Sequence, residues 1–367
     1  MTWKQLLLYI ALGLFIGVAV VAVIWIVFIP YNTVDLLITN GTVIDGSGGP
    51  ARVVDIGIRD GKIVELSRWR YLLTKATTHI DAAGLVVAPG FIDVHTHVEA
   101  NVPAAGPFRA DNFLRQGVTT IITGNCGRSR TNIAELFQKL EQNGSYLNVA
   151  SLVGHNSVRQ QVMGLVSRPP TPEELNAMKN LVDRAMKDGA VGFSSGLVYV
   201  PGRFATTAEG VALATVAGSH GALYASHIRD EGPQGIDAIR EALEVGRAAG
   251  IATQISHFKS AGPRQWGTMA QRLALLDDAR EQGQKVGVDF YPYARSSTTT
   301  DVLLPDWALK DNRAGLREVA RSATVRRKLH DEIIFSLSAN GWKDLTFVKL
   351  AAGPKEWIGK TLVRDLR

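Results

Sequence analysis

Beyond Pro89 the sequence alternates short apolar runs of β type with helical segments, and this alternation limits the fold more than any other feature. It is typical of repeated βα units built on a parallel sheet. One helical segment opens at Pro172 and continues to Lys187. The pattern predicts an α/β fold, a (β/α)8 TIM-type barrel with seven strands present and the eighth missing. The predicted strands cover residues 91–94, 119–123, 147–153, 190–193, 222–225, 252–255 and 286–290.

The segments on either side of this region have different patterns. Residues 35–88 contain short β-like runs separated by Gly and Asp turns, which predicts a small N-terminal β-sandwich portion. We divide the chain into a membrane anchor with its linker (1–34), a small β domain (35–88), a metal-dependent barrel (89–305) and an incomplete insertion before the missing last strand (306–367).

The N-terminus contains a long run without charge. No charged residue occurs from Leu6 to Pro30, and a helix of this length spans roughly 37 Å, enough to cross a hydrocarbon core. The run is longer than the apolar part of a signal peptide, which predicts an uncleaved, single-pass transmembrane helix. Lys4 precedes the run, so we expect the N-terminus in the cytoplasm and the catalytic domain in a periplasmic or extracellular location.

Charge and cysteine content exclude some classes of protein. The formal net charge is +6, but Lys and Arg are scattered, and the densest stretch, 313–328, is interleaved with Glu318 and apolar residues. That is the pattern of a solvated helix face, and we expect no nucleic-acid partner. The single cysteine, Cys126, excludes an internal disulfide and leaves a catalytic, metal-binding or buried apolar role.

Histidine and cysteine follow the predicted strands at the positions where barrel enzymes carry their working residues. His95 and His97 come after the first predicted strand, and alternation places both imidazoles on one face. Cys126 follows the second strand, His227 the fifth and His257 the sixth. Imidazole and thiolate suit zinc, and a catalytic zinc holds three protein ligands and leaves a position for water. We therefore expect a zinc site at this end of the sheet.

Short motifs stand in a fixed order from Asp35 to about Ser297. They are Asn-Gly-Thr-Val-Ile-Asp-Gly at 40–46, Ala-Pro-Gly-Phe-Ile-Asp at 88–93, the His95-Thr96-His97 pair, and the segments 123–127, 154–155, 227–231, 256–259 and 289–293. This set resembles the amidohydrolase superfamily and, within it, the N-acyl-D-amino-acid deacylases, also called D-aminoacylases. The resemblance implies that Cys126 replaces the carboxylated lysine that bridges two metals in other branches. It also implies one tight zinc on Cys126, His227 and His257, with His95 and His97 contributing to a second, weaker site.

The resemblance further implies an activity, the zinc-dependent hydrolysis of the amide bond of N-acyl-D-amino acids to a carboxylate and a D-amino acid. Lys259, Tyr291 and Ser297 match the positions that hold the substrate carboxylate in the family. The family's general base is an aspartate at the end of the eighth strand. We expect it beyond Arg367, so the chain resembles a C-terminally truncated member. The predicted small-molecule partner is an N-acyl amino acid, and no oligomeric state is predicted.

Two alternatives remain open. A truncated amidohydrolase fragment could bind zinc through Cys126, His227 and His257 and lack activity, because the general base is missing. A membrane-tethered binding module with an incidental histidine cluster is the third interpretation, and it requires five ligand-type residues to align by chance. Metal content and turnover discriminate between these hypotheses.

Overall fold

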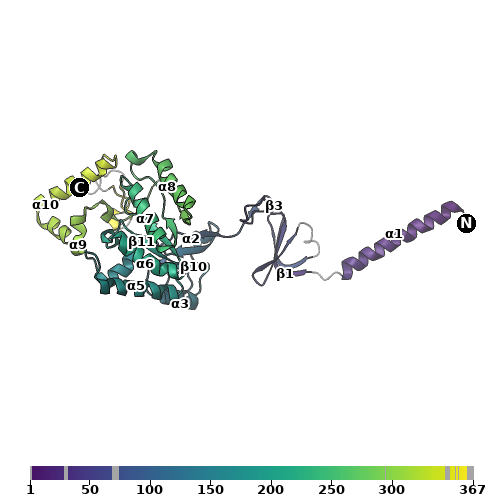
Figure 1. Ribbon diagram of the computed structural model, residues 1–367. Helices are drawn as coiled ribbons and strands as arrows, with labels where there is room; N and C mark the ends of the chain where they lie inside the picture. Colours follow the sequence, from purple (N-terminus) through teal and green to yellow (C-terminus); the bar gives the residue numbers. More distant parts are fainter. Residues whose placement is uncertain are drawn as a thin grey trace. The chain divides into compact units, whose positions relative to one another are not determined.

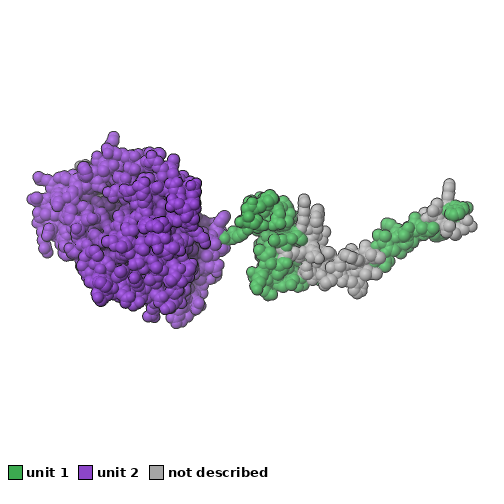
Figure 2. All heavy atoms as spheres, viewed as in Figure 1, with its two compact units in different colours: residues 1–90 green, residues 91–367 purple. Residues whose placement is uncertain are grey.

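The computed structural model describes residues 2–28, 32–67, 74–293, 295–343, 348–351, 353 and 355–361. These residues divide into two compact units, 1–90 and 91–367, which are coloured separately in Figure 2. The candidate site residues predicted from the sequence all belong to the second unit. The division of the chain into four segments made from the sequence stays a prediction.

The first unit contains a helix and two small mixed sheets. The order of the larger sheet is β5-β4-β1-β6, with β1 antiparallel to β4 and parallel to β6. The smaller sheet has the order β3-β2-β7. These two small sheets replace the predicted β-sandwich portion. The elements are α1 (Trp3–Phe28), β1 (Asn32–Thr39), β2 (Thr42–Val43), β3 (Arg52–Val53), β4 (Asp55–Arg59), β5 (Lys62–Ser67), β6 (Thr74–Asp81) and β7 (Val86–Val87).

The predicted membrane anchor requires a correction. None of the helices in the described part of the chain has both the length and the apolar character needed to cross a membrane. The predictions of a transmembrane helix, a membrane partner and a single-pass topology with a periplasmic or extracellular domain are therefore wrong. They rested on the length and the lack of charge of one run, and these two properties are necessary for a span without being sufficient.

The second unit is built on a single parallel sheet. Its seven strands lie in the order β14-β13-β12-β11-β10-β9-β8, so the strands that are consecutive in sequence from β8 to β14 are neighbours in the sheet. All six pairings are parallel. The strands are β8 (Phe91–Asp93), β9 (Val118–Thr123), β10 (Asn148–Gly154), β11 (Gly192–Gly196), β12 (Leu223–His227), β13 (Ala252–Ile255) and β14 (Val286–Val288).

The prediction of a (β/α)8 barrel is therefore wrong for this chain. Closure of a barrel requires the first and last strands to pair, whereas β8 and β14 are the two edges of an open sheet in the described residues. Periodicity in a sequence identifies strands, but it carries no information on whether the edges of the sheet meet. The observed class is a mixed α/β fold with a half-barrel parallel sheet and additional small sheets.

Helices follow the strands in the manner of βα units (Figure 1). Thr171 caps α5: its hydroxyl accepts from the Glu174 backbone N–H, and the Glu174 carboxylate accepts from the Thr171 N–H. The helix α9 is interrupted by non-helical residues at 310–313. The helices are α2 (Asp111–Leu114), α3 (Ile133–Asn143), α4 (His155–Met163), α5 (Pro172–Lys187), α6 (Thr207–Ser219), α7 (Gly235–Ala249), α8 (Met269–Glu281), α9 (Asp306–Arg321) and α10 (Ala323–Ala339). Short 3-10 helices cover Glu99–Asn101, Gly202–Phe204, Pro263–Gln265, Thr300–Leu303 and Lys355–Trp357.

The largest apolar core lies between the central strands and the helices that cover them. Phe193 on β11 is fully buried, and its ring lies 6.0 Å from that of Tyr224 on β12 and 5.8 Å from that of His155. Met178 and Val182 of α5 belong to the same cluster. This core fixes the central strands, and with them the ends of the strands that carry the candidate site.

Phe193→Ala should lower the free energy of unfolding by about 3–5 kcal/mol, because the change removes a buried ring and leaves a cavity. Urea denaturation followed by tryptophan fluorescence measures the effect. The matched control is Phe335→Ala, since Phe335 on α10 is 78% exposed. We expect its effect to stay within about 0.5 kcal/mol. Equal effects of the two substitutions would contradict this account of the core.

Candidate metal centre

The carboxyl ends of four strands bring five ligand-type side chains to one edge of the sheet. His95 and His97 follow β8, Cys126 follows β9, His227 is the last residue of β12, and His257 follows β13. In a parallel sheet all carboxyl ends lie at the same edge, so residues far apart in sequence converge there. The cluster includes every metal ligand predicted from the sequence.

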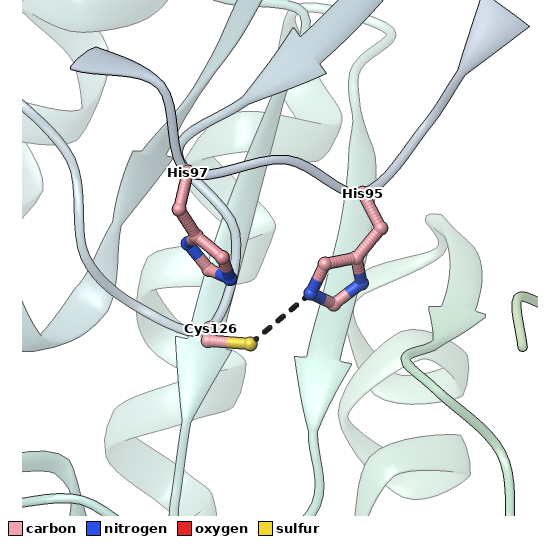
Figure 3. Close-up of side chains that lie close together, drawn as sticks. All are labelled: His95, His97 and Cys126. Atoms are coloured by element: carbon pink, nitrogen blue, oxygen red, sulfur yellow. Dashed lines mark hydrogen bonds between the residues drawn. The ribbon is translucent and has the colours of Figure 1, made fainter. Parts of the chain in front are cut away.

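Cys126 stands between two groups of potential ligands. In one group, His95, His97 and Cys126, the ligand atoms lie within 4.8 Å of one another. Figure 3 shows both imidazoles directed toward the sulfur, and the Sγ of Cys126 lies 3.3 Å from the Nε2 of His95. The other group, with the same limit of 4.8 Å, is Cys126, His227 and His257. Cys126 Sγ is 3.7 Å from His257 Nε2, which in turn is 2.8 Å from His227 Nδ1.

The backbone around the cluster is unusual at two of these residues. Cys126 has φ of 54° and His257 has φ of 37°, in the left-handed region that residues with a side chain rarely adopt. The Cys126 loop also packs its backbone directly on neighbouring strands. A Cβ atom at Gly196 would lie 2.1 Å from the carbonyl oxygen of Cys126, and one at Gly154 would lie 2.3 Å from that of Gly127. Only glycine fits at 154 and 196, and this close approach fixes the position of the thiol.

The thiol of Cys126 is in an environment that opposes its charge. Burial raises its pKa to about 12, and the carboxylates of Asp289 and Glu231 add to the effect. The free thiol is therefore protonated at neutral pH. A thiol becomes a thiolate on binding zinc, so metal binding here releases a proton.

Two imidazoles of the cluster, those of His97 and His227, likewise favour the neutral form that binds metals. Although His97 is exposed as a residue, desolvation of its ring and the neighbouring His95 and His257 lower its pKa to about 4. Burial, together with the adjacent His257, holds the pKa of His227 well below its usual value. These neutral rings and the buried thiol aim their ligand atoms at common points, which is the donor set expected for zinc. The residues present therefore fit a bound metal.

Two carboxylates hold histidine rings of the cluster from outside. Glu231 Oε1 lies 2.7 Å from Nδ1 of His257, and Asp289 Oδ1 lies 3.1 Å from Nδ1 of His95. Asp289 also accepts a hydrogen bond of 2.6 Å from the His257 backbone N–H. Burial alone would raise the pKa of Glu231, but hydrogen bonding from His257 and the charge of Lys259 help to lower it to about 2. Such carboxylate–histidine pairs orient rings at metal sites and set which nitrogen is free to bind.

Two of the three predicted substrate-binding residues lie together. The Nζ of Lys259 donates to Glu231 and is 3.0 Å from Nδ1 of His257, and it lies 5.3 Å from the centre of the Tyr291 ring. Ser297 is exposed in the segment after β14. Its neighbour Thr298 is 2.9 Å from the hydroxyl of Tyr199. The structure thus places Lys259 beside the cluster and Tyr291 beside Lys259, whereas Ser297 forms no hydrogen bond with a described residue.

Sequence reasoning missed the contacts made by Glu231 and Asp289. No local signal pairs a carboxylate after β14 with a histidine after β8, because the sheet alone brings them together. The histidine at the end of β10 has a structural role. His155 Nε2 lies 2.8 Å from Glu209 Oε1 and both side chains are buried, while Arg159 donates to the same carboxylate.

Residues 78–333 match the model of the amidohydrolase family. An N-acyl-D-glutamate deacylase of Alcaligenes xylosoxydans xylosoxydans is 40% identical over 297 residues, which cover 75% of this chain and 59% of the relative. A D-aminoacylase of the same organism is 37% identical over 299 residues, covering 72% of this chain and 58% of the relative. The chain thus spans less than two thirds of the length of these curated relatives.

Solved structures of deacylases also match this chain. The N-acyl-D-glutamate deacylase of Bordetella bronchiseptica, in complex with zinc and a phosphonate that mimics the tetrahedral intermediate, matches with a TM-score of 0.68 and 33% identity. The match covers 82% of this chain and 73% of that structure. A D-aminoacylase structure matches with a TM-score of 0.68 and 30% identity over 81% of this chain and 69% of that one.

Gly196→Ala should displace the Cys126 loop, because the new methyl group overlaps the Cys126 carbonyl oxygen. We expect a loss of about 1–3 kcal/mol in stability, as for other overpacked positions, and a lower metal content after equilibration with zinc. Gly210→Ala on α6 is the control, since the nearest atom to its added Cβ is at 3.4 Å, an ordinary contact. Unfolding curves and metal analysis compare the two variants; a normal metal content in Gly196→Ala would contradict the close approach.

Proposed function

This chain belongs to the amidohydrolase family, and we propose that it hydrolyses the amide bond of N-acyl-D-amino acids to a carboxylate and a D-amino acid. The observation that carries the proposal is the convergence of Cys126, His227 and His257 on one point at the carboxyl edge of the sheet. The names of the relatives agree with it, since they are deacylases of N-acyl-D-amino acids.

We propose zinc as the metal, with Cys126, His227 and His257 as the tight site and His95 and His97 as a second, weaker site that shares Cys126. Thiolate and imidazole are the ligands that zinc favours. Bound zinc supplies Lewis acidity toward the acyl carbonyl of the substrate and toward water. Titration of the metal-free chain with zinc, with turnover measured at each step, gives the number of metals needed for activity.

The chain's own residues would orient the reaction. Glu231 fixes the ring of His257, and Asp289 fixes the ring of His95 while it anchors the His257 backbone. Lys259 presents an ammonium group beside the cluster, suited to the carboxylate of the substrate. We propose that Tyr291 and Ser297 complete this carboxylate site, with the hydroxyl groups as donors.

Replacement of a ligand should remove the metal and the activity together. In the zinc-equilibrated chain we expect release of free amino acid from N-acetyl-D-methionine, measured by amine detection. Cys126→Ala and His257→Ala should lose bound zinc and turnover, since each removes one of the three donors of the tight site. His330→Ala is the control, because this histidine lies exposed on α10. Unchanged zinc in Cys126→Ala would exclude the proposed site, and zinc without turnover in the unchanged chain would favour the inactive-fragment hypothesis.

Glu231→Gln should weaken zinc binding by roughly 10- to 100-fold, because the amide no longer supplies a charged acceptor to His257 Nδ1. Competition with a chelator of known affinity measures the change. Glu241→Gln is the matched control; this carboxylate forms a bidentate pair with Arg229, and within the described part of the chain it has no hydrogen bond or ion pair with the histidine cluster. An equal loss of affinity in both variants would point to a general effect on folding, and the carboxylate–histidine account would fail.

A further inference from the structure

Arg128 is a cation beside the metal cluster with no acidic partner. It lies in the loop after β9, two residues beyond Cys126, and is exposed. Arg128 forms no ion pair with any residue that the structure describes. Lys259 and Arg229, the other cations around the site, are paired with Glu231 and Glu241. Of the three cations Arg128, Lys259 and Arg229, Arg128 therefore differs in having no carboxylate partner among the described residues.

An aromatic ring holds the Arg128 guanidinium near the candidate ligands. Its Cζ atom lies 5.2 Å from the centre of the Tyr199 ring, and that ring contacts His227 edge-on with 4.7 Å between the ring centres. The Tyr199 hydroxyl is 2.9 Å from Thr298 Oγ1, which fixes the ring from its other end. A guanidinium over an aromatic face gains a favourable electrostatic interaction and keeps its hydrogen-bond donors free.

The charge of Arg128 acts on the same space as the cluster. Its positive charge adds to the effect of burial that lowers the pKa of His97, and it opposes the effect of burial that raises the pKa of Cys126. A carboxylate of a ligand bound at the cluster would meet the same positive potential. The guanidinium fork also matches the geometry of a carboxylate, with two parallel hydrogen bonds.

Arg128 and Lys259 approach the cluster from different strands. Lys259 follows β13 and Arg128 follows β9, and three strands separate β9 from β13 in the sheet. Lys259 lies beside His257 and Tyr291, whereas Arg128 lies beside Tyr199. Two separate cations fit a ligand with two separate carboxylates.

We propose that Arg128 binds a second carboxylate of the substrate, so that this chain prefers N-acyl-D-amino acids with an acidic side chain. The inference rests on the proposed function. In this arrangement Lys259 receives the α-carboxylate and Arg128 receives the side-chain carboxylate, while Tyr199 holds the guanidinium in place. A substrate with a neutral side chain offers Arg128 no carboxylate, so the guanidinium stays solvated and adds nothing to the binding energy.

Steady-state kinetics with N-acetyl-D-glutamate and its neutral isostere N-acetyl-D-glutamine test this specificity. The zinc-equilibrated chain should prefer the acidic substrate, and Arg128→Met should lower kcat/KM for it by roughly 10- to 100-fold, as expected for a charge-assisted bidentate pair. For N-acetyl-D-glutamine, kcat/KM should change by less than about twofold, because this substrate has no second carboxylate that could pair with Arg128. Arg130→Met is the matched control, because Arg130 lies in the same loop and faces Glu135 at 3.7 Å.

Three outcomes overturn the inference. If the chain without substitution prefers N-acetyl-D-glutamine, the proposed preference for acidic side chains is wrong. If Arg128→Met leaves kcat/KM for N-acetyl-D-glutamate unchanged, Arg128 does not contact the substrate. If the substitution lowers kcat/KM equally for both substrates, Arg128 binds the α-carboxylate that they share. Failure to turn over any N-acyl-D-amino acid overturns the proposed function instead, and calorimetry then decides on Arg128. D-glutamate should bind roughly tenfold or more weakly to Arg128→Met, with D-glutamine unchanged; any other pattern contradicts the contact.

Discussion

The turn at Cys126 is the constraint on which the candidate metal centre depends. Cys126 adopts a positive φ, and the loop packs its carbonyl oxygen against Gly196 of β11. A residue with a side chain in this conformation carries roughly 1–3 kcal/mol of strain, which the surrounding structure must offset. This conformation places the Cys126 sulfur close to both His95, which follows β8, and His257, which follows β13. One thiol therefore connects the two groups of histidines.

The carboxylates around the cluster prepare it for a cation. Glu231 is buried, yet its pKa is about 2, because His257, His227 and Lys259 outweigh the effect of burial. The same carboxylate and that of Asp289 raise the pKa of the Cys126 thiol further than burial does by itself. Lys259 offsets part of the charge of Glu231, but the two carboxylates still disfavour a further negative charge on the Cys126 sulfur. The positive charge of a divalent metal would reverse this effect and let the thiol ionise.

The sequence predicted local features well and pairings between distant segments poorly. The strand predicted at 252–255 is β13, because a short run with the β-branched residues Thr253 and Ile255 lies between turns and forms a local signal. The convergence of His227 and His257 follows from strand-end placement. The contact of Asp289 with His95 joins segments almost two hundred residues apart and has no local signature. How far the sheet curves from β8 to β14 is equally non-local, so the sequence could not distinguish the predicted barrel, with its eighth strand missing, from the open half-barrel sheet that the described residues form. The prediction of a membrane-spanning helix was wrong because it used the length of the run and its lack of charge, which do not measure apolar character.

The two cations beside the cluster differ in how their charge is used. Lys259 already shares Glu231 with His257, so a substrate carboxylate that binds Lys259 must compete with an ionised side chain. Arg128 has no such competitor among the described residues and is held by the face of Tyr199 alone. Since Tyr199 also contacts His227, the position of Arg128 is tied to the geometry of the tight site. Recognition of an acidic side chain would therefore depend on the same packing that places the metal ligands, and a metal-binding site and its specificity would share one aromatic support.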